Sequence, residues 1–150
     1  MQIPQQSGIG ATDYESAFRA SVIAEPRHID ELGHVNNVVY LDWAQHIAIA
    51  HWRHVAPKEM LEGSVWVAVR HEIDYRDAVL EGERVEARTW LGEVSGAKFA
   101  RHIDLRKPGA ARFSARVLTW WAWLDAATRR PKRIDSSVLE AFGLQGRFPA

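Results

Sequence analysis

Eight residues in the first third of the chain combine side chains suited to acid–base or nucleophilic chemistry. The run from Asp30 to Asn37 reads DELGHVNN and leads directly into a long apolar segment. A carboxylate such as Asp30 acts in proteins as a general base or as a nucleophile. The unpaired backbone amides at a helix start, here near Asn37 and Val38, stabilise an oxygen that gains negative charge. The same pattern also fits a polar loop with an Asx turn at Asp30 and an asparagine cap, so both interpretations stay open at this point.

The elements that position this run follow from the spacing of apolar residues. Residues 18–24 alternate between apolar and polar side chains, which predicts a strand that Pro26 ends. Residues 38–52 are apolar on most sides and contain no Gly or Pro, which predicts a buried helix of about four turns. Asn36 or Asn37 is a good N-cap for this helix, and Pro57 follows its last turn.

A two-residue period dominates the second half of the chain. It predicts four strands, at residues 65–76, 84–91, 99–106 and 113–124. The last strand is apolar on both faces near its end, which favours a central position in the sheet or a place at a subunit interface. Short turns between the strands predict an antiparallel meander and an α+β class, with the sheet wrapped around the helix. A short helix is expected to begin near Asp135 or Ser136 and to run to Phe142.

Composition narrows the class of protein. The 150 residues fit one domain, which we expect over residues 17–150 after a flexible tail at residues 1–16. The 19 basic and 19 acidic residues cancel, which argues against a nucleic-acid partner. The absence of cysteine excludes disulfides and thiolate catalysis. With no apolar run near the length of a membrane span and no signal-peptide pattern, we expect a cytoplasmic protein that needs no membrane.

Metal binding is not expected from the histidines of the predicted helix. His46 and His51 lack the i, i+4 spacing of helical metal ligands, and no HExxH pattern or carboxylate triad accompanies them.

A longer run carries a resemblance to a known family. Residues 30–43, DELGHVNNVVYLDW, resemble the motif of the hotdog-fold acyl-CoA thioesterases of the 4-hydroxybenzoyl-CoA thioesterase type. The similarity continues into residues 69–75 and the end of the last strand, and it covers about residues 17–134. It implies a hotdog fold, with an antiparallel five-stranded sheet wrapped around one long central helix. The order of strands and helices predicted from periodicity agrees with that fold.

The resemblance also implies roles for individual residues. Asp30 matches the family's catalytic carboxylate, which either activates water against the thioester carbonyl or attacks it to form an anhydride. The backbone amide near Asn37 or Val38 would polarise the thioester oxygen. His34 either faces the thioester or water, or holds the shape of the loop.

One departure from the family concerns the central helix. Many relatives carry a Glu and an Arg where this chain has Gln45 and Ala48. A mechanism based on a helix carboxylate therefore has no acid at position 45, which increases the weight on Asp30.

Substrate contacts are expected from four further residues: Gly33, Tyr40, Trp43 and His71. Tyr40 and Trp43 lie one turn apart and pack either the core or the acyl pocket. His71 lies on the apolar face of its strand, either as a buried hydrogen-bonded residue or as a lining of that pocket. Candidates for the phosphates of coenzyme A are Arg70, Arg76 and Arg101, with the basic turn at residues 129–133 as a second choice.

The resemblance implies a thioesterase that hydrolyses an acyl-CoA or aroyl-CoA to the free acid and CoA, with no cofactor or metal. It also implies a homodimer or homotetramer whose active site is built between two subunits. Two alternatives remain. One is a hotdog hydratase acting on enoyl thioesters, and the other is a non-catalytic hotdog protein that binds an acyl-CoA or an acyl carrier.

Overall fold

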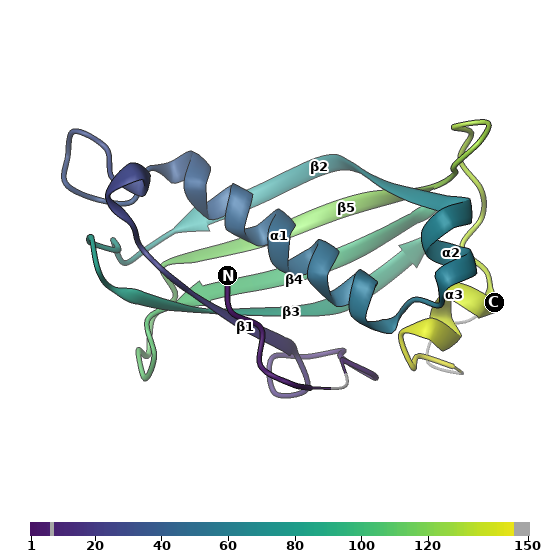
Figure 1. Cartoon of the computed structure of the whole chain (residues 1–150), viewed down its shortest axis with the longest axis horizontal. Helices are drawn as coiled ribbons and strands as arrows, with labels where there is room; N and C mark the ends of the chain where they lie inside the picture. Colours follow the sequence, from purple (N-terminus) through teal and green to yellow (C-terminus); the bar gives the residue numbers. More distant parts are fainter. Residues whose placement is uncertain (7, 146–150) are drawn as a thin grey trace.

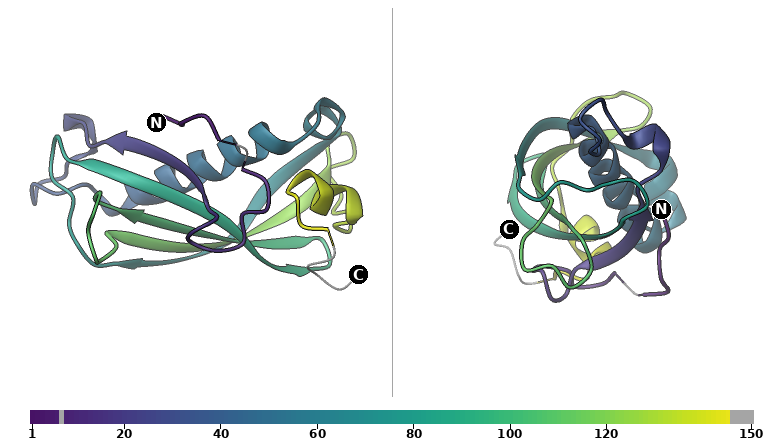
Figure 2. Two further views of the ribbon diagram at one scale, coloured as in Figure 1. Left: turned by 90° about the horizontal axis from the view of Figure 1, so that it is seen from below. Right: turned by 90° about the vertical axis from the view of Figure 1, so that its left-hand side faces the viewer.

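A long helix runs inside a curved, five-stranded antiparallel sheet in the computed structural model of this chain (Figures 1 and 2). The structure describes residues 1–6 and 8–145. The strands lie in the order β1-β3-β4-β5-β2 across the sheet. Their bounds are Phe18–Ile23 for β1, Ser64–Tyr75 for β2, Arg84–Ser95 for β3, Lys98–Arg106 for β4 and Ala115–Asp125 for β5. The predicted α+β hotdog architecture is confirmed.

The central helix α1 spans Asn37–Val55 and has local signals at both ends. At its start the Asn36 side chain accepts a hydrogen bond from the Val38 amide at 3.0 Å, which is a typical N-cap. At its end Ala56 has extended backbone angles, as expected for a residue that precedes a proline. Its buried side chains recur every three or four residues and form one face: Tyr40, Trp43, Ala44, Ile47, Ala48, His51 and Trp52.

Two hydrophobic clusters pack along this helix. The first surrounds its N-terminal half and includes Phe18 of β1, Val85 of β3 and Ile103 of β4. The second surrounds its C-terminal end and contains mainly aromatic side chains, among them Trp52 and Trp123. The predicted terminal helix contributes to this second cluster. It spans Ser136–Ala141 as α3, and the Asp135 side chain caps it.

The expected meander of the last four strands is wrong for β2. Strands β3, β4 and β5 are sequential neighbours, but β2 pairs with β5, from Ser64 opposite Asp125 to Tyr75 opposite Ala115. Residues 76–83 therefore return the chain to the other side of the sheet, where β3 pairs with β1. The short turn near Gly82 alone favours a hairpin between β2 and β3, but β5 lies inside the sheet and pairs with β4 on one side and with β2 on the other. β2 becomes an edge strand.

Two segments differ from the sequence-based expectation. A short helix, α2, spans Lys58–Gly63 immediately after Pro57. Part of the expected N-terminal tail contacts the domain, since Gly8 and Ala11 are buried and the Ala11 carbonyl accepts a hydrogen bond from the Leu91 amide. These small residues are held by hydrogen bonds of their backbone, so no pattern of hydrophobic side chains in the sequence indicates their contacts. Ser7 and residues 146–150, included in the predicted tail and domain, lie outside the described residues.

Within the described residues, no helix is both long enough and apolar enough to cross a lipid bilayer.

The helix–sheet packing predicts unequal effects at two isoleucines of α1. Ile47 is 0% exposed and Ile49 is 38% exposed. Ile47→Ala should lower the free energy of unfolding by about 2–5 kcal/mol, because it leaves a cavity in the core. Ile49→Ala is the matched control and should cost under about 1 kcal/mol. Urea unfolding followed by circular dichroism measures both, and equal losses would contradict this packing.

Candidate active site

The loop before α1 holds Asp30 in a fixed conformation. The Asp30 amide donates to the His34 carbonyl at 2.9 Å, and the Gly33 amide donates to the Asp30 carbonyl at 3.0 Å. The Leu32 amide donates to Asp30 Oδ1 at 2.9 Å, which completes an Asx turn. Gly33 has a φ of +77°, a value that favours glycine. The other carboxylate oxygen of Asp30, Oδ2, has no hydrogen-bond partner among the described residues.

Two backbone amides at the helix start were candidates for polarising a carbonyl. The Val38 amide already donates to the Asn36 cap. The Asn37 amide has no hydrogen-bond partner within the described part of the chain, which leaves it as the available donor. The Asn37 carbonyl accepts a hydrogen bond from the Tyr75 hydroxyl at 3.0 Å, so the helix start lies beside the end of β2. The side chains of His34, Asn37 and Val38 are exposed.

Tyr40 and Trp43 belong to the core. Both are buried, and their rings pack edge to face with centroids 5.6 Å apart. The Tyr40 hydroxyl accepts a hydrogen bond from the Val79 amide at 3.2 Å, and burial raises its pKa. Trp43 also packs edge to face against His28. Of the two roles that the sequence left open for Tyr40 and Trp43, core packing is the one these contacts describe.

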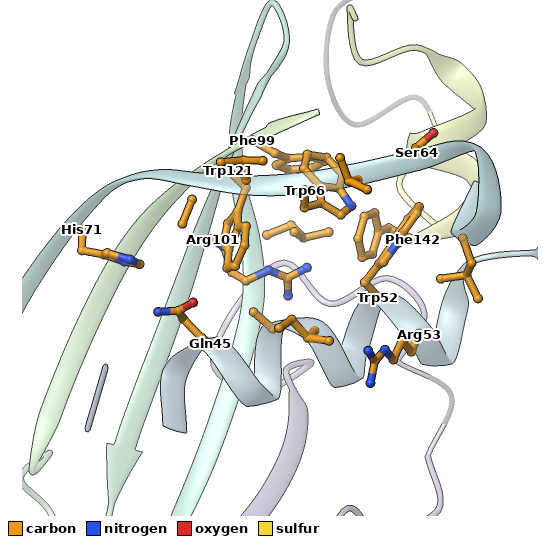
Figure 3. A pocket seen from close by; sticks show the side chains of 17 residues that line it. Gln45, Trp52, Arg53, Ser64, Trp66, His71, Phe99, Arg101, Trp121 and Phe142 are labelled. Atoms are coloured by element: carbon orange, nitrogen blue, oxygen red, sulfur yellow. The ribbon is translucent and has the colours of Figure 1, made fainter. Parts of the chain in front are cut away.

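A cavity of about 680 Å³ lies between the C-terminal half of α1 and the first half of β2 (Figure 3). The register of β2 shifts between Ala68 and Arg70, within the part of the strand that borders the cavity. Aromatic rings supply much of its wall: Trp52, Trp66, Phe99, Trp121 and Phe142. A site of this size and character accommodates an acyl group.

Of the four predicted substrate residues, His71 lines this cavity, and Gly33, Tyr40 and Trp43 do not. His71 is partly buried, and burial lowers its pKa. Its Nδ1 forms a hydrogen bond of 2.8 Å with the Thr119 hydroxyl on β5. Gln45, which replaces the common glutamate of the family, lines the same cavity.

A hydrogen-bonded chain of polar groups crosses the interior beside the cavity. Arg101 Nη1 donates to His51 Nδ1 at 3.0 Å and to the Thr89 hydroxyl at 3.1 Å. Because His51 Nδ1 accepts, the ring is neutral and its Nε2 donates to the Gly8 carbonyl at 2.6 Å. Burial and the nearby Arg101 charge hold the pKa of His51 down, to about 3. Burial also lowers the pKa of Arg101, to about 9.

The three arginines proposed for CoA phosphates lie in different environments. Arg70 and Arg76 are exposed, and Arg70 forms an ion pair with Glu72. Arg101 is only 5% exposed and lines the cavity, so it lies inside the protein and not at the surface with the other two arginines. Arg101 lies two residues from the buried Phe99 and from the buried Ile103, so it shares their face of β4, which is the sequence signal for its burial.

Comparisons with known proteins identify the family. Residues 24–142 match the model of the thioesterase-like superfamily. The chain belongs to this superfamily. No curated protein sequence gives a significant match.

Solved structures support the same fold. A Thermus thermophilus thioesterase, crystallised with coenzyme A and zinc, shares 25% identity with a TM-score of 0.74, over 88% of this chain and 96% of that one. A 1,4-dihydroxy-2-naphthoyl-CoA thioesterase from Synechocystis shares 14% identity with a TM-score of 0.73, over 89% and 99%. A probable thioesterase from Escherichia coli shares 16% identity with a TM-score of 0.72, over 84% and 96%. Among the described residues of this chain, no group of three or more His, Cys, Asp or Glu side chains is placed to hold a metal ion.

The Asp30 loop and the cavity flank different halves of α1. The loop precedes Asn37, whereas the first helix residue that lines the cavity is Gln45. Eight residues of helix separate these positions by about 12 Å. The described chain therefore does not bring its own Asp30 into the cavity wall.

The neutral state of His51 predicts a pH-dependent stability. The folded pKa of about 3 lies below the ordinary value of 6.5, so the unfolded chain takes up a proton first as the pH falls. The free energy of unfolding should therefore decrease from about pH 6.5 downward, by up to about 1.4 kcal/mol per pH unit. Urea titrations of the wild type and His51→Gln between pH 7 and pH 4.5 measure this, and the variant should show a shallower decrease. A His51 ring proton that titrates near pH 6.5 in the folded protein would contradict the assignment.

Proposed function

We propose that this protein hydrolyses acyl-CoA or aroyl-CoA thioesters to the free acid and CoA. The observation that carries the proposal is the Asp30 loop in a thioesterase-superfamily fold. Among the described residues, neither Asp30 Oδ2 nor the Asn37 amide at the helix start has a hydrogen-bond partner. The relative from Thermus thermophilus crystallised with coenzyme A, and the Synechocystis relative, named for a naphthoyl-CoA substrate, support this substrate class.

Asp30 is the proposed catalytic carboxylate. Acting as a base, it removes a proton from water while the water oxygen attacks the thioester carbonyl carbon. Acting as a nucleophile, it forms an anhydride that water then opens. In both routes the carbon–sulfur bond breaks and the CoA sulfur leaves as a thiolate that takes up a proton. The Asn37 amide donates to the oxygen that gains charge, and His34 faces the water or the thioester.

We further propose that the active site forms between two copies of the chain. β2 is an edge strand that pairs on one side only, with β5, among the described residues, and its Val67 and Val69 side chains are 43% and 50% exposed. The helix start lies beside the C-terminal end of β2, through the bond between Tyr75 and Asn37. The cavity lies beside the N-terminal half of β2.

Antiparallel pairing of two β2 edges about a twofold axis then has a specific consequence. It aligns the C-terminal end of one β2 with the N-terminal half of the other. The Asp30 loop of one copy is thereby brought to the cavity of its partner, which resolves the separation found within one chain. A homodimer is the minimum assembly, and a homotetramer would pair two such dimers. The exposed Arg70 and Arg76 lie on or next to this edge and are the proposed contacts for CoA phosphates.

An Asp30→Asn variant tests the proposed catalytic role. Asparagine keeps the carbonyl oxygen that accepts from Leu32, so the loop should be preserved. We expect the kcat for thiol release from acyl-CoA substrates to fall by about 100-fold or more, with KM and thermal stability nearly unchanged. Release of free thiol across a panel of aliphatic and aromatic acyl-CoAs provides the measurement.

Asp42→Asn is the matched control for this variant. Asp42 is an exposed carboxylate on α1, near His46, and its loss should leave the rate near that of the wild type. Equal activity of the wild type and Asp30→Asn would remove Asp30 from the mechanism. Tight acyl-CoA binding by the wild type without turnover would favour the non-catalytic binding protein instead.

A further inference from the structure

The cavity contains a buried cation that the chain does not neutralise. Arg101 is 5% exposed, and no carboxylate forms an ion pair with it in the described part of the chain. Its neighbours Asp104, Arg106 and Arg116 form a separate cluster of ion pairs. The contacts of Arg101 itself are with neutral groups, namely His51, Thr89 and the ring of Phe142 at 5.5 Å. Burying a charge without a partner of opposite sign is costly, and a bound anion would remove this cost.

The guanidinium group faces the cavity. In Figure 3 it lies between the ribbon of β2 and that of α1, in the space framed by Gln45, Trp52 and Phe142. Only Nη1 has hydrogen-bond partners among the described residues, and these hold the group from one side. Nε and Nη2 have none. These two nitrogens form the side-on fork that binds the two oxygens of a carboxylate.

The other lining groups add no negative charge to balance Arg101. The rings of Trp66 and Trp121 line the cavity, but their buried indole nitrogens do not face its open space. None of the lining residues is acidic. A purely aliphatic acyl chain would leave Nε and Nη2 of Arg101 against hydrocarbon without a hydrogen-bond partner among the described residues, which is unfavourable.

We propose that this cavity selects acyl groups that carry a carboxylate at the end remote from the thioester, with Arg101 as its bidentate partner. The inference rests on the proposed thioester hydrolysis, because it places the reacting carbonyl at the mouth of the cavity and the far end of the acyl group inside. The aromatic walls accommodate a flat body between the two ends. His51 and Thr89 are positioning residues that fix the orientation of the guanidinium.

Binding of small probes in which a neutral amide replaces the thioester tests this selectivity without requiring turnover. Benzamide, terephthalamide and 4-carbamoylbenzoate share a ring and an amide that replaces the thioester, and only the last carries a carboxylate. Trp52, Trp66 and Trp121 line the cavity, so intrinsic fluorescence reports binding. We expect 4-carbamoylbenzoate to bind the wild type about tenfold or more tighter than either neutral probe.

Variants assign the preference to one residue. Arg101→Met should abolish the preference, and Arg101→Lys should retain part of it as a point charge. Arg53→Met is the matched control, because Arg53 also lines the cavity but is exposed to solvent. It should leave the preference unchanged. Equal binding of the three probes by the wild type would overturn the proposal. So would a preference for 4-carbamoylbenzoate that is lost in Arg53→Met but kept in both Arg101→Lys and Arg101→Met.

Turnover provides the second arm of the test. The wild type should show a higher kcat/KM for 4-carboxybenzoyl-CoA than for benzoyl-CoA, and Arg101→Lys should reduce this ratio even if Arg101→Met does not fold. Asp30→Asn should lose turnover of both thioesters while keeping the probe preference. Probe selectivity without hydrolysis by the wild type would contradict the proposed enzyme but not the site. Hydrolysis with equal kcat/KM for both thioesters would contradict the carboxylate site alone.

Discussion

Burial of α1 inside the curved sheet is the interaction on which the rest of the structure depends. Its N-terminal half packs closely against residues of β1, β3, β4 and β5, with Ile47 fully excluded from solvent. That packing and the Asn36 cap fix where the helix starts, and therefore where the Asp30 loop and the Asn37 amide lie. Along the C-terminal half, β2 with its irregular register and the helix enclose a cavity. One helix thus sets the position of both the Asp30 loop and the cavity.

Electrostatics in this protein is local. The formal charges of the chain sum to zero, so no overall field gathers a phosphorylated substrate. Exposed arginines along β2 remain available to a polar head group, whereas Arg101 is held in the interior by a neutral histidine. The low pKa of His51 is a consequence of that arrangement, because a protonated ring would face a buried guanidinium. Within the cavity, Arg101 is therefore the buried charge on which the proposed recognition of a carboxylate depends.

Local sequence patterns predicted much of this structure. The features that depend on contacts between distant residues could not be predicted from them. The bounds of α1 followed from an asparagine cap and Pro57, and the strands followed from a two-residue period. The partner of β2 depends on burial of both faces of β5, which no turn pattern specifies. Gly8 is anchored through its carbonyl to His51, a contact that leaves no trace in hydrophobicity. The two-residue period of β4 did indicate that Arg101 lies on the buried face of the strand, but an arginine side chain is usually found at the surface.

The central claim is that Asp30 of one subunit serves the cavity of its partner. Complementation in a heterodimer tests it directly, with Asp30→Asn on one chain and the cavity-filling Ala48→Trp on the other. Each homodimer should be folded and nearly inactive. If the site spans two subunits, the purified heterodimer contains one intact site and should recover about half of the wild-type activity per dimer. A heterodimer as inactive as both homodimers would show that loop and cavity act within one chain and would contradict the account.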